Sequence, residues 1–177
     1  MSLRQDHGPM EVRGLHTGFL YSSAYLEDLA GTPPPALHPR FEEMHRYLEH
    51  MKPAGLLPGR QHIDPVDFPQ FLSLINLVDV EYVHGHRRFR FRLVGTVQTA
   101  MAGRDVTGMP VDRAVLPSQV LRITGNMELA AQSGRPVYDR FPMPHPDRQF
   151  IESERVYYPL AADGRNVDLL LILNGYF

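Results

Sequence analysis

The amino-acid sequence predicts an α+β fold in which short helices and one longer helix cover one face of an antiparallel sheet. Residues 76–93 alternate between apolar and polar side chains on both sides of a short turn, which is typical of a β-hairpin. Glycine and proline interrupt residues 95–116, and a longer amphipathic pattern follows up to residue 133. Three further strand-like segments between residues 136 and 177 bring the expected number of strands to five.

Residues 1–36 are expected to form an N-terminal helical extension with a proline-rich linker, as an appendage to the domain. A short helix is expected around "FLYSSAYLEDLA", and "GTPPPALHP" after it is typical of a stiff linker.

Residues 37–55 are predicted to hold one amphipathic helix that runs from Pro39 to Met51. Its apolar residues recur at steps of three and four, and Pro53 with Gly55 ends the helix. Two interpretations remain open, because this stripe could lie on its own domain or form a short coiled-coil-like contact. We expect a homodimer whose interface uses the stripe, which consists of Phe41, Met44, Leu48 and Met51.

The domain proper is predicted to span residues 56–177. It begins with a short helix at "DPVDFPQFLSLI", where Asp64 suits the N-cap and Pro65 the first helical position. The segment "NLVDVEYV" then reads as a strand that leads into the hairpin.

Gly85 and His86 are expected to form a two-residue type II′ loop in this hairpin. The resulting register puts opposite charges on one face of the sheet and apolar residues on the other. The expected pairs are His84–Arg87, Glu81–Arg90, Asp79–Arg92, Tyr82–Phe89, Val80–Phe91 and Val78–Leu93. The arginines would then form a ladder of salt bridges on the face away from the core.

Single-turn helices are expected in "GTVQTAMAGRDVTGMPVDRAV". A longer helix is expected in "LPSQVLRITGNMELAAQSG", where Pro117 lies near its start and Gly134 beyond its end. The last three strands are "PVYDRFPM", "FIESERVYYPLA" and "NVDLLLILNGYF", and the Asp-Gly of "ADGR" signals a hairpin between the last two. Alternation alone does not tell which face of these strands is inside.

Composition limits the function classes. The net charge is −2 with no basic cluster outside the arginine strand, which disfavours nucleic acid and anionic membranes as partners. The chain has no cysteine, so disulfides, thiolate catalysis and cysteine-ligated metals are excluded. No apolar run of about 18 residues could span a bilayer, and no signal-peptide core occurs at the N-terminus. We therefore expect a cytoplasmic protein.

No set of residues predicts catalysis or metal binding. The chain lacks a GxSxG elbow, a phosphate loop and an HExxH motif. Glu152 and Glu154 alternate with Ser153 and Arg155, which we interpret as one polar face of a strand rather than an acid/base pair. An enzyme is the least expected class.

The order of these elements resembles the PAS fold over about residues 56–177. The motifs "RLVGT" at 92–96 and "GRDVTG" at 103–108, with "LPGRQHIDP" before the sheet, are similar to a bacterial subfamily of single-domain PAS-like proteins. The resemblance implies sheet order 2-1-5-4-3, a pocket between sheet and helices, and a sensory or regulatory role in signal transduction. PAS domains bind haem, flavins, small acids or no known ligand, and many act as dimerisation modules.

Neither haem nor flavin is expected as a cofactor. A light-oxygen-voltage type of flavin domain needs a reactive cysteine, which is absent, and the helix at 117–133 holds no histidine that could serve as an axial haem ligand.

A small-molecule ligand is expected between the sheet and the helices, and an unidentified signalling protein is expected downstream. A protein-interaction domain with a filled core is the alternative. Apolar lining is expected from Phe89, Phe91, Leu93, Met101, Met109 and Met127. Polar candidates on the later strands are Tyr138, Arg140, Tyr157 and Tyr158.

Overall fold

The computed structural model describes residues 18–145 and 148–177. Its strands span Leu20–Tyr21 (β1), Ile75–Val83 (β2), His86–Leu93 (β3), Val137–His145 (β4), Arg148–Leu160 (β5) and Leu169–Tyr176 (β6). Its α-helices span Ser23–Leu29 (α1), Pro39–Met51 (α2), Thr96–Ala102 (α3), Val111–Ala114 (α4) and Val120–Ser133 (α5). Short 3₁₀ helices occupy Arg60–His62, Pro65–Asp67, Pro69–Leu74 and Pro117–Gln119. None of the helices in these described ranges is long and apolar enough to cross a membrane.

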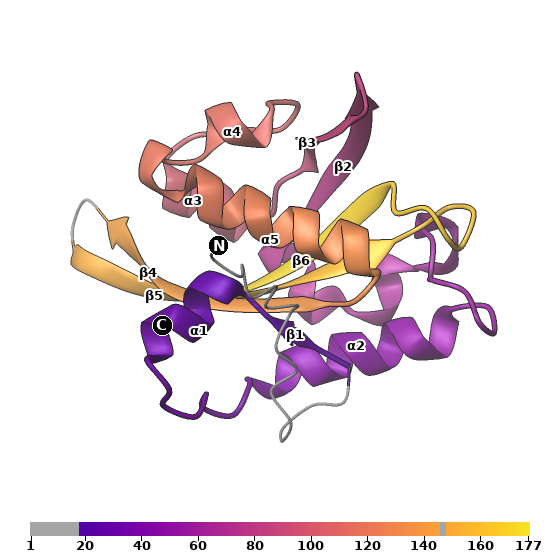
Figure 1. Cartoon of the computed structure of the whole chain (residues 1–177), viewed down its shortest axis with the longest axis horizontal. Coiled ribbons are helices and arrows are strands. Elements are labelled where there is room, and N and C mark those ends of the chain that lie inside the picture. The colour runs from indigo at the N-terminus through magenta and orange to yellow at the C-terminus, as the bar shows by residue number, and fades with distance from the viewer. Residues whose placement is uncertain (1–17, 146–147) are drawn as a thin grey trace, which may run out of the picture.

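The predicted α+β class is confirmed. One six-stranded sheet runs in the order β1-β4-β5-β6-β2-β3 (Figure 1). All neighbouring strands are antiparallel except β1, which is parallel to β4. The five strands expected from the sequence therefore follow the order 2-1-5-4-3, and β1 is added beyond β4.

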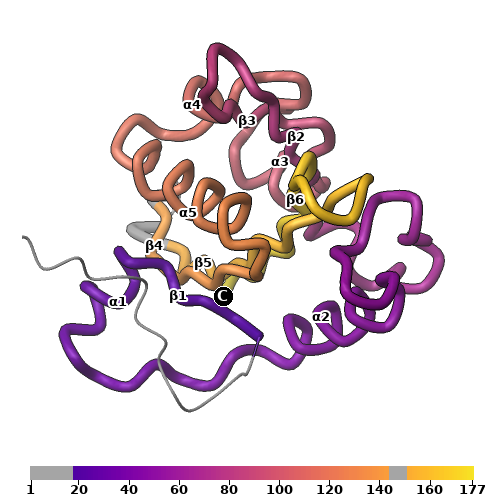
Figure 2. Tube along the Cα trace, turned by 45° about the vertical axis from the view of Figure 1, so that its right-hand side comes forward, coloured from indigo at the N-terminus to yellow at the C-terminus, as the bar shows by residue number. Residues whose placement is uncertain are grey.

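Helices cover both faces of the sheet. Helices α3, α4 and α5 lie on one face, and α1 and α2 lie on the other (Figures 1 and 2). Successive residues of the central strands alternate between two separate apolar cores, so that Tyr157 and Leu170 face α5 while Tyr158 and Leu171 face α2. The expectation of helices on one face holds for α3–α5, and α2 adds a layer opposite them.

The N-terminal segment from residue 19 to residue 29 is part of this fold. Leu20 donates a backbone hydrogen bond to Pro136, and Ser22 donates one to Tyr138, both at 2.8 Å. Phe19 and Tyr25 are buried. The expected appendage is therefore wrong for these residues, because the short strand β1 satisfies the open edge of β4. Residues 1–17 of the expected extension lie outside the described residues.

The hairpin register differs from the expected one by two residues. Val83 pairs with His86, so the turn is His84-Gly85 rather than Gly85-His86. Both turn residues have positive φ, at 49° and 80°, as a type I′ turn requires, and histidine adopts this conformation more readily than most residues. The correct pairs are Tyr82–Arg87, Glu81–Arg88, Val80–Phe89, Asp79–Arg90, Val78–Phe91 and Leu77–Leu93.

The shift of two residues leaves the side chains between Val78 and Phe91 on their predicted faces, whereas a bulge at Leu77 pairs Leu93 with Leu77, which packs in the core on the α2 side. The ion pairs also form between the expected partners, although diagonally: Arg90 to Glu81 at 3.1 Å and Arg92 to Asp79 at 2.5 Å. Both pairs are largely exposed, so they contribute little to stability.

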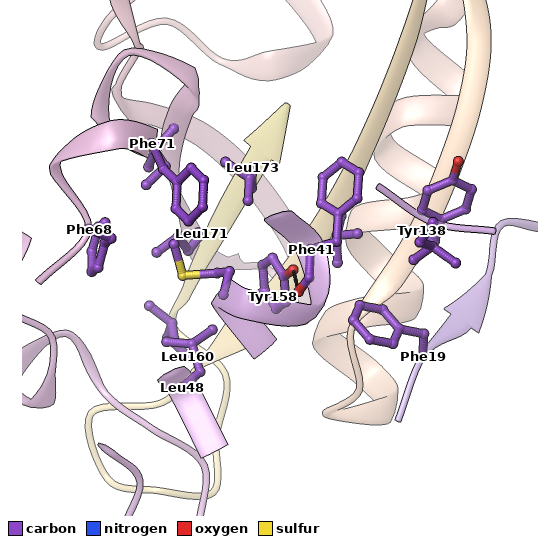
Figure 3. Packing of buried hydrophobic residues seen from close by; sticks show 14 of the residues in the cluster. Phe19, Phe41, Leu48, Phe68, Phe71, Tyr138, Tyr158, Leu160, Leu171 and Leu173 are labelled. Carbon is purple, nitrogen blue, oxygen red and sulfur yellow. Dashed lines mark hydrogen bonds between the residues drawn. The ribbon is translucent and has the colours of Figure 1, made fainter. Parts of the chain in front are cut away.

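Helix α2 has the predicted bounds, but its apolar stripe is used within the chain. Phe41, Met44 and Leu48 are at most 3% exposed, and Figure 3 shows Phe41 beside Tyr158 and Leu48 beside Leu160, which both belong to the same core. The Tyr158 hydroxyl also donates a 2.7 Å hydrogen bond to the Phe41 carbonyl. The stripe, with the half-buried Met51 at its end, therefore does not offer the expected free surface for a dimer.

We predict that Leu48→Glu destabilises the folded chain rather than separating two chains. A charge placed in the core between α2 and the sheet should lower the free energy of unfolding by about 4 kcal/mol. Calorimetry should then show a melting temperature lower by about 10 °C. The control Arg46→Glu lies on the exposed side of the same helix and should change little. An unchanged melting temperature combined with a halved mass in light scattering would instead place the stripe between chains.

We also predict that Gly85→Ala destabilises the hairpin. Gly85 has a φ of 80°, which alanine adopts only with strain, so the free energy of unfolding should fall by about 1 kcal/mol. The matched control is Gly125→Ala in α5, where an added Cβ meets nothing within 4 Å and should stabilise the helix by about 0.5–1 kcal/mol. Urea denaturation of both variants checks the pair, and equal effects of the same sign would contradict the type I′ turn.

Candidate functional site

A cavity of about 1180 Å³ lies between the sheet and the helices α3–α5. Strands β2–β6 each contribute at least one residue to its floor, and α3, α4 and α5 form its roof. We call this space the cavity.

The roof is attached to the sheet by backbone contacts at two motifs. Gly95 precedes α3, and a Cβ there would lie 2.5 Å from the Ser73 carbonyl oxygen, so only glycine fits. The Asn76 side chain accepts a 2.9 Å hydrogen bond from the Gly95 amide. Further along, the segment before α4 pairs with β3, because Phe91 donates to the Met109 carbonyl at 3.0 Å. The motifs "RLVGT" and "GRDVTG" therefore lie where the roof joins the sheet.

Most of the enclosed lining is apolar. The sheet contributes Phe91, Met143 and Ile172 to this lining. Met101 comes from α3, Val106 from the segment before α4, and Ile123 and Met127 from α5. Methionine adapts its shape to what it contacts, so this lining suits an apolar ligand body of variable outline.

A small number of polar side chains face the same space. Gln98 lines the cavity and accepts a hydrogen bond from the Tyr176 hydroxyl, which joins α3 to β6. Burial raises the pKa of Tyr176, and the nearby positive charge of Arg155 opposes this shift. At the opening, Arg104, Asp112 and Arg113 are exposed. The lining thus has more cationic than anionic groups.

Arg155 on β5 is the buried charge of the cavity. Its side chain is almost wholly enclosed, with the residue 6% exposed. One terminal nitrogen donates to Ser153 Oγ at 2.8 Å and contacts Met143 Sδ at 3.5 Å, and the guanidinium lies 4.7 Å from the centre of the Phe141 ring. Its Nε has no hydrogen-bond partner. Among the described side chains, none provides a carboxylate within ion-pair distance of Arg155.

The nearest strand neighbour with a carboxylate is already bound elsewhere. Asp139 lies opposite Arg155 in the β4–β5 register and is fully buried. Arg122 of α5 holds both its oxygens, at 2.9 and 2.6 Å, and Asn126 donates to it at 2.6 Å. Burial alone would lower the pKa of Arg122, but hydrogen bonds and the charge of Asp139 raise it above its ordinary value. Arg122 also pairs with Asp28 of α1 at 2.7 Å.

The structure brings three of the expected ligand-lining residues to the cavity, namely Phe91, Met101 and Met127. Phe89 is buried in the same core, Met109 packs along β3, and Leu93 is 45% exposed, but none of these three lines the cavity. Phe89 keeps its predicted face, whereas the bulge in β2 pairs Leu93 with Leu77, which packs in the core on the α2 side.

The polar candidates on the later strands require a correction. Tyr138 and Tyr158 face α2, on the opposite side of the sheet from the cavity. The Tyr138 hydroxyl donates to Glu154 at 2.8 Å, and burial together with the Glu154 charge raises the pKa of this tyrosine. Arg140 forms an ion pair with Glu152 at 3.3 Å, also away from the cavity. Tyr157 alone faces α5, where burial raises its pKa and Arg155 opposes the shift.

Sequence reasoning missed Arg155. The alternation of Glu152, Ser153, Glu154 and Arg155 was expected to form one polar face, but Glu152 and Glu154 lie on the α2 side while Ser153 and Arg155 lie on the cavity side. Because both faces of this part of β5 hold polar residues, the alternation of side chains does not tell which face points toward the cavity. The available signal is spacing, because Arg155 shares its strand face with Tyr157 in the apolar "VYYPL" segment.

Metal binding finds no support in the side chains that the structure describes. No group of three or more histidine, aspartate, glutamate or cysteine residues lies close enough to hold an ion. His84 occupies the exposed hairpin turn, and His86 starts β3.

Known structures with a similar fold include light-oxygen-voltage and PAS proteins. The LOV protein of Rhodobacter sphaeroides has 12% identity and a TM-score of 0.45, with 65% of this chain and 69% of that chain covered. An RNA-binding light-oxygen-voltage receptor has 15% identity and a TM-score of 0.42, with 71% and 37% covered. The PAS domain of a protein from Colwellia psychrerythraea has 17% identity and a TM-score of 0.41, with 64% and 98% covered.

These similarities are too distant to transfer any function, and a comparison with curated protein sequences gives no match. A family model of the PAS domain, however, matches residues 37–173, which is most of the chain and includes α2, β2–β5, the first part of β6 and the whole roof. The chain therefore belongs to the PAS domain family.

Proposed function

We propose that this PAS domain is a sensory or regulatory module that binds a small molecule in the cavity and acts through protein contacts. The observation that carries the proposal is the cavity itself, at about 1180 Å³ with a mostly apolar lining. Ligand sites in proteins have volumes of roughly 300–1,000 Å³ and combine apolar walls with a few convergent polar groups. The Arg155 guanidinium and the Gln98 amide supply such groups here.

The alternative function, a protein-interaction domain with a filled core, is less well supported. Protein interiors are close-packed and rarely leave voids much larger than a water molecule. The core between α2 and the sheet meets this description, since Phe41 and Met44 are fully buried there, whereas the space under α3 and α4 does not. The two faces of one sheet thus serve different purposes in this proposal.

A homodimer and a downstream signalling protein remain the proposed partners. With Phe41, Met44 and Leu48 buried, a dimer would have to use a surface other than this stripe. Catalysis is not part of the proposal, because the cavity lining has no described pair of groups arranged as nucleophile and base.

We predict that the purified protein is colourless. The chain has no cysteine, and the described lining of the cavity includes no histidine that could ligate a haem iron. Absorption spectroscopy of protein from its own host should therefore show no band at about 400 or about 450 nm, where haem and flavin cofactors are expected to absorb. Either band would contradict this part of the proposal.

We further predict that a small molecule co-purifies with the protein and is lost when the cavity is filled. Ala114→Phe should place a ring in the cavity, because Ala114 lies in its wall, and retention of the ligand should fall at least about tenfold. Native mass spectrometry of both proteins, purified from the host, measures the bound mass. The control Leu121→Phe changes a side chain that is 87% exposed on α5.

Loss of the ligand in Ala114→Phe but not in Leu121→Phe is the expected outcome. A wild type that carries no small molecule, and that no member of a metabolite library stabilises against heat, would favour the filled-core alternative.

A further inference from the structure

We infer that the cavity takes an organic carboxylate, whose charged group binds Arg155 and whose apolar body lies against α3 and α5. This inference rests on the proposed function and names the ligand class of the same site. Three observations support it: a buried charge without an ion pair, two buried polar atoms without partners on neighbouring strands, and an apolar space lined by α3 and α5.

The unpaired charge is the first observation. On the cavity side of β4 and β5, Asp139 is fully buried and Arg155 is 6% exposed, and Arg122 of α5 reaches this side half-buried. Arg122 and Asn126 hold both oxygens of Asp139, and Arg122 also pairs with Asp28, so neither described carboxylate is left as a counter-ion for Arg155. A buried ion without a counter-ion is strongly unfavourable. A ligand anion at Arg155 would remove this penalty.

Two buried polar atoms without partners belong to residues that are paired across β5 and β6. Arg155 Nε and Asn174 Oδ1 are buried without a hydrogen bond, and Asn174 is the cross-strand partner of Arg155. Unsatisfied buried groups are rare in native folds, and two on paired residues indicate a position that a ligand or water completes.

The shape and charge of the cavity narrow the ligand class. A guanidinium offers a planar fork of donors that matches a carboxylate. Met101, Ile123 and Met127 line the space in front of it, which favours an apolar body over a ligand with several charges. Arg104 and Arg113 at the opening are exposed and line the same cavity. Their charge attracts anions toward it.

The binding test uses straight-chain carboxylates from acetate to decanoate, with the alcohol and the alkyl phosphate of each chain length. Isothermal titration calorimetry should show that affinity rises with chain length and that each alcohol binds at least about tenfold more weakly than its acid. Arg155→Gln should reduce the affinity for the acids at least about tenfold and leave the alcohols within about twofold. Arg155→Lys should restore binding in part, because it keeps the charge but not the fork.

The stability test compares the two arginines without any ligand. Arg155→Met removes an unpaired charge and should raise the melting temperature, whereas Arg122→Met removes the partner of the buried Asp139 and should lower it. A purely structural role of Arg155 predicts a lower melting temperature for both variants. Together with acid binding, opposite signs would assign Arg155 to the ligand rather than to the fold.

Each contrary result has a separate meaning. Equal binding of acids and alcohols, or acid binding that Arg155→Gln leaves unchanged, overturns the carboxylate inference while the small-molecule function stands. Tighter binding of the phosphates than of the acids overturns it in favour of a phosphate ligand. If no member of the three series binds, the inference is also overturned, and native mass spectrometry of the host protein decides separately whether the proposed function survives.

Discussion

Burial of both faces of β5 and β6 is the constraint on which the rest of the structure depends. The segments "VYYPL" and "LLLILN" are almost continuously apolar, so neither face can be left in water without losing the free energy that drives folding. Helix α5 covers one face and α2 the other, and each supplies its own core. The N-terminal segment then completes the layer of α2 and closes the edge of β4 through β1. A domain described by its sheet and its α5 side alone would therefore be incomplete.

The two covering layers differ in how well they can fill space. Helix α2 presents an unbroken stripe over thirteen residues and packs Phe41 and Met44 almost without exposure. On the other face, α3 and α4 span seven and four residues and end or begin at glycine and proline. Such short helices cannot present a continuous apolar stripe, and backbone contacts at Gly95 and Met109 hold their ends to the sheet. The cavity is the space that this arrangement leaves under them.

Two arginines show how position decides the energetic role of a buried charge. Arg122 reaches from α5 to Asp139 and Asp28, so its charge is neutralised and it ties α5 to both β4 and α1. Arg155 lies opposite the same Asp139 but forms no ion pair with a described carboxylate, and it contacts the Ser153 hydroxyl, the Met143 sulfur and the Phe141 ring. Helix α5 also lines the cavity through Ile123. One helix thus connects the space beside Arg155 with the N-terminal segment.

The sequence by itself determined the local features of this protein. The spacing of apolar residues placed α2 between Pro39 and Met51, Asp64 was correctly predicted as an N-cap, and alternation assigned the hairpin side chains to their faces. Tertiary structure alone decided the rest. A two-residue register shift preserves every face, so alternation could not distinguish the turn at His84-Gly85 from its neighbour. Whether the Arg155 side chain faces the cavity or α2 depends on which helices cover each face of β5. Periodicity is a local property of the chain, whereas the choice between two faces is made by distant segments that pack against them.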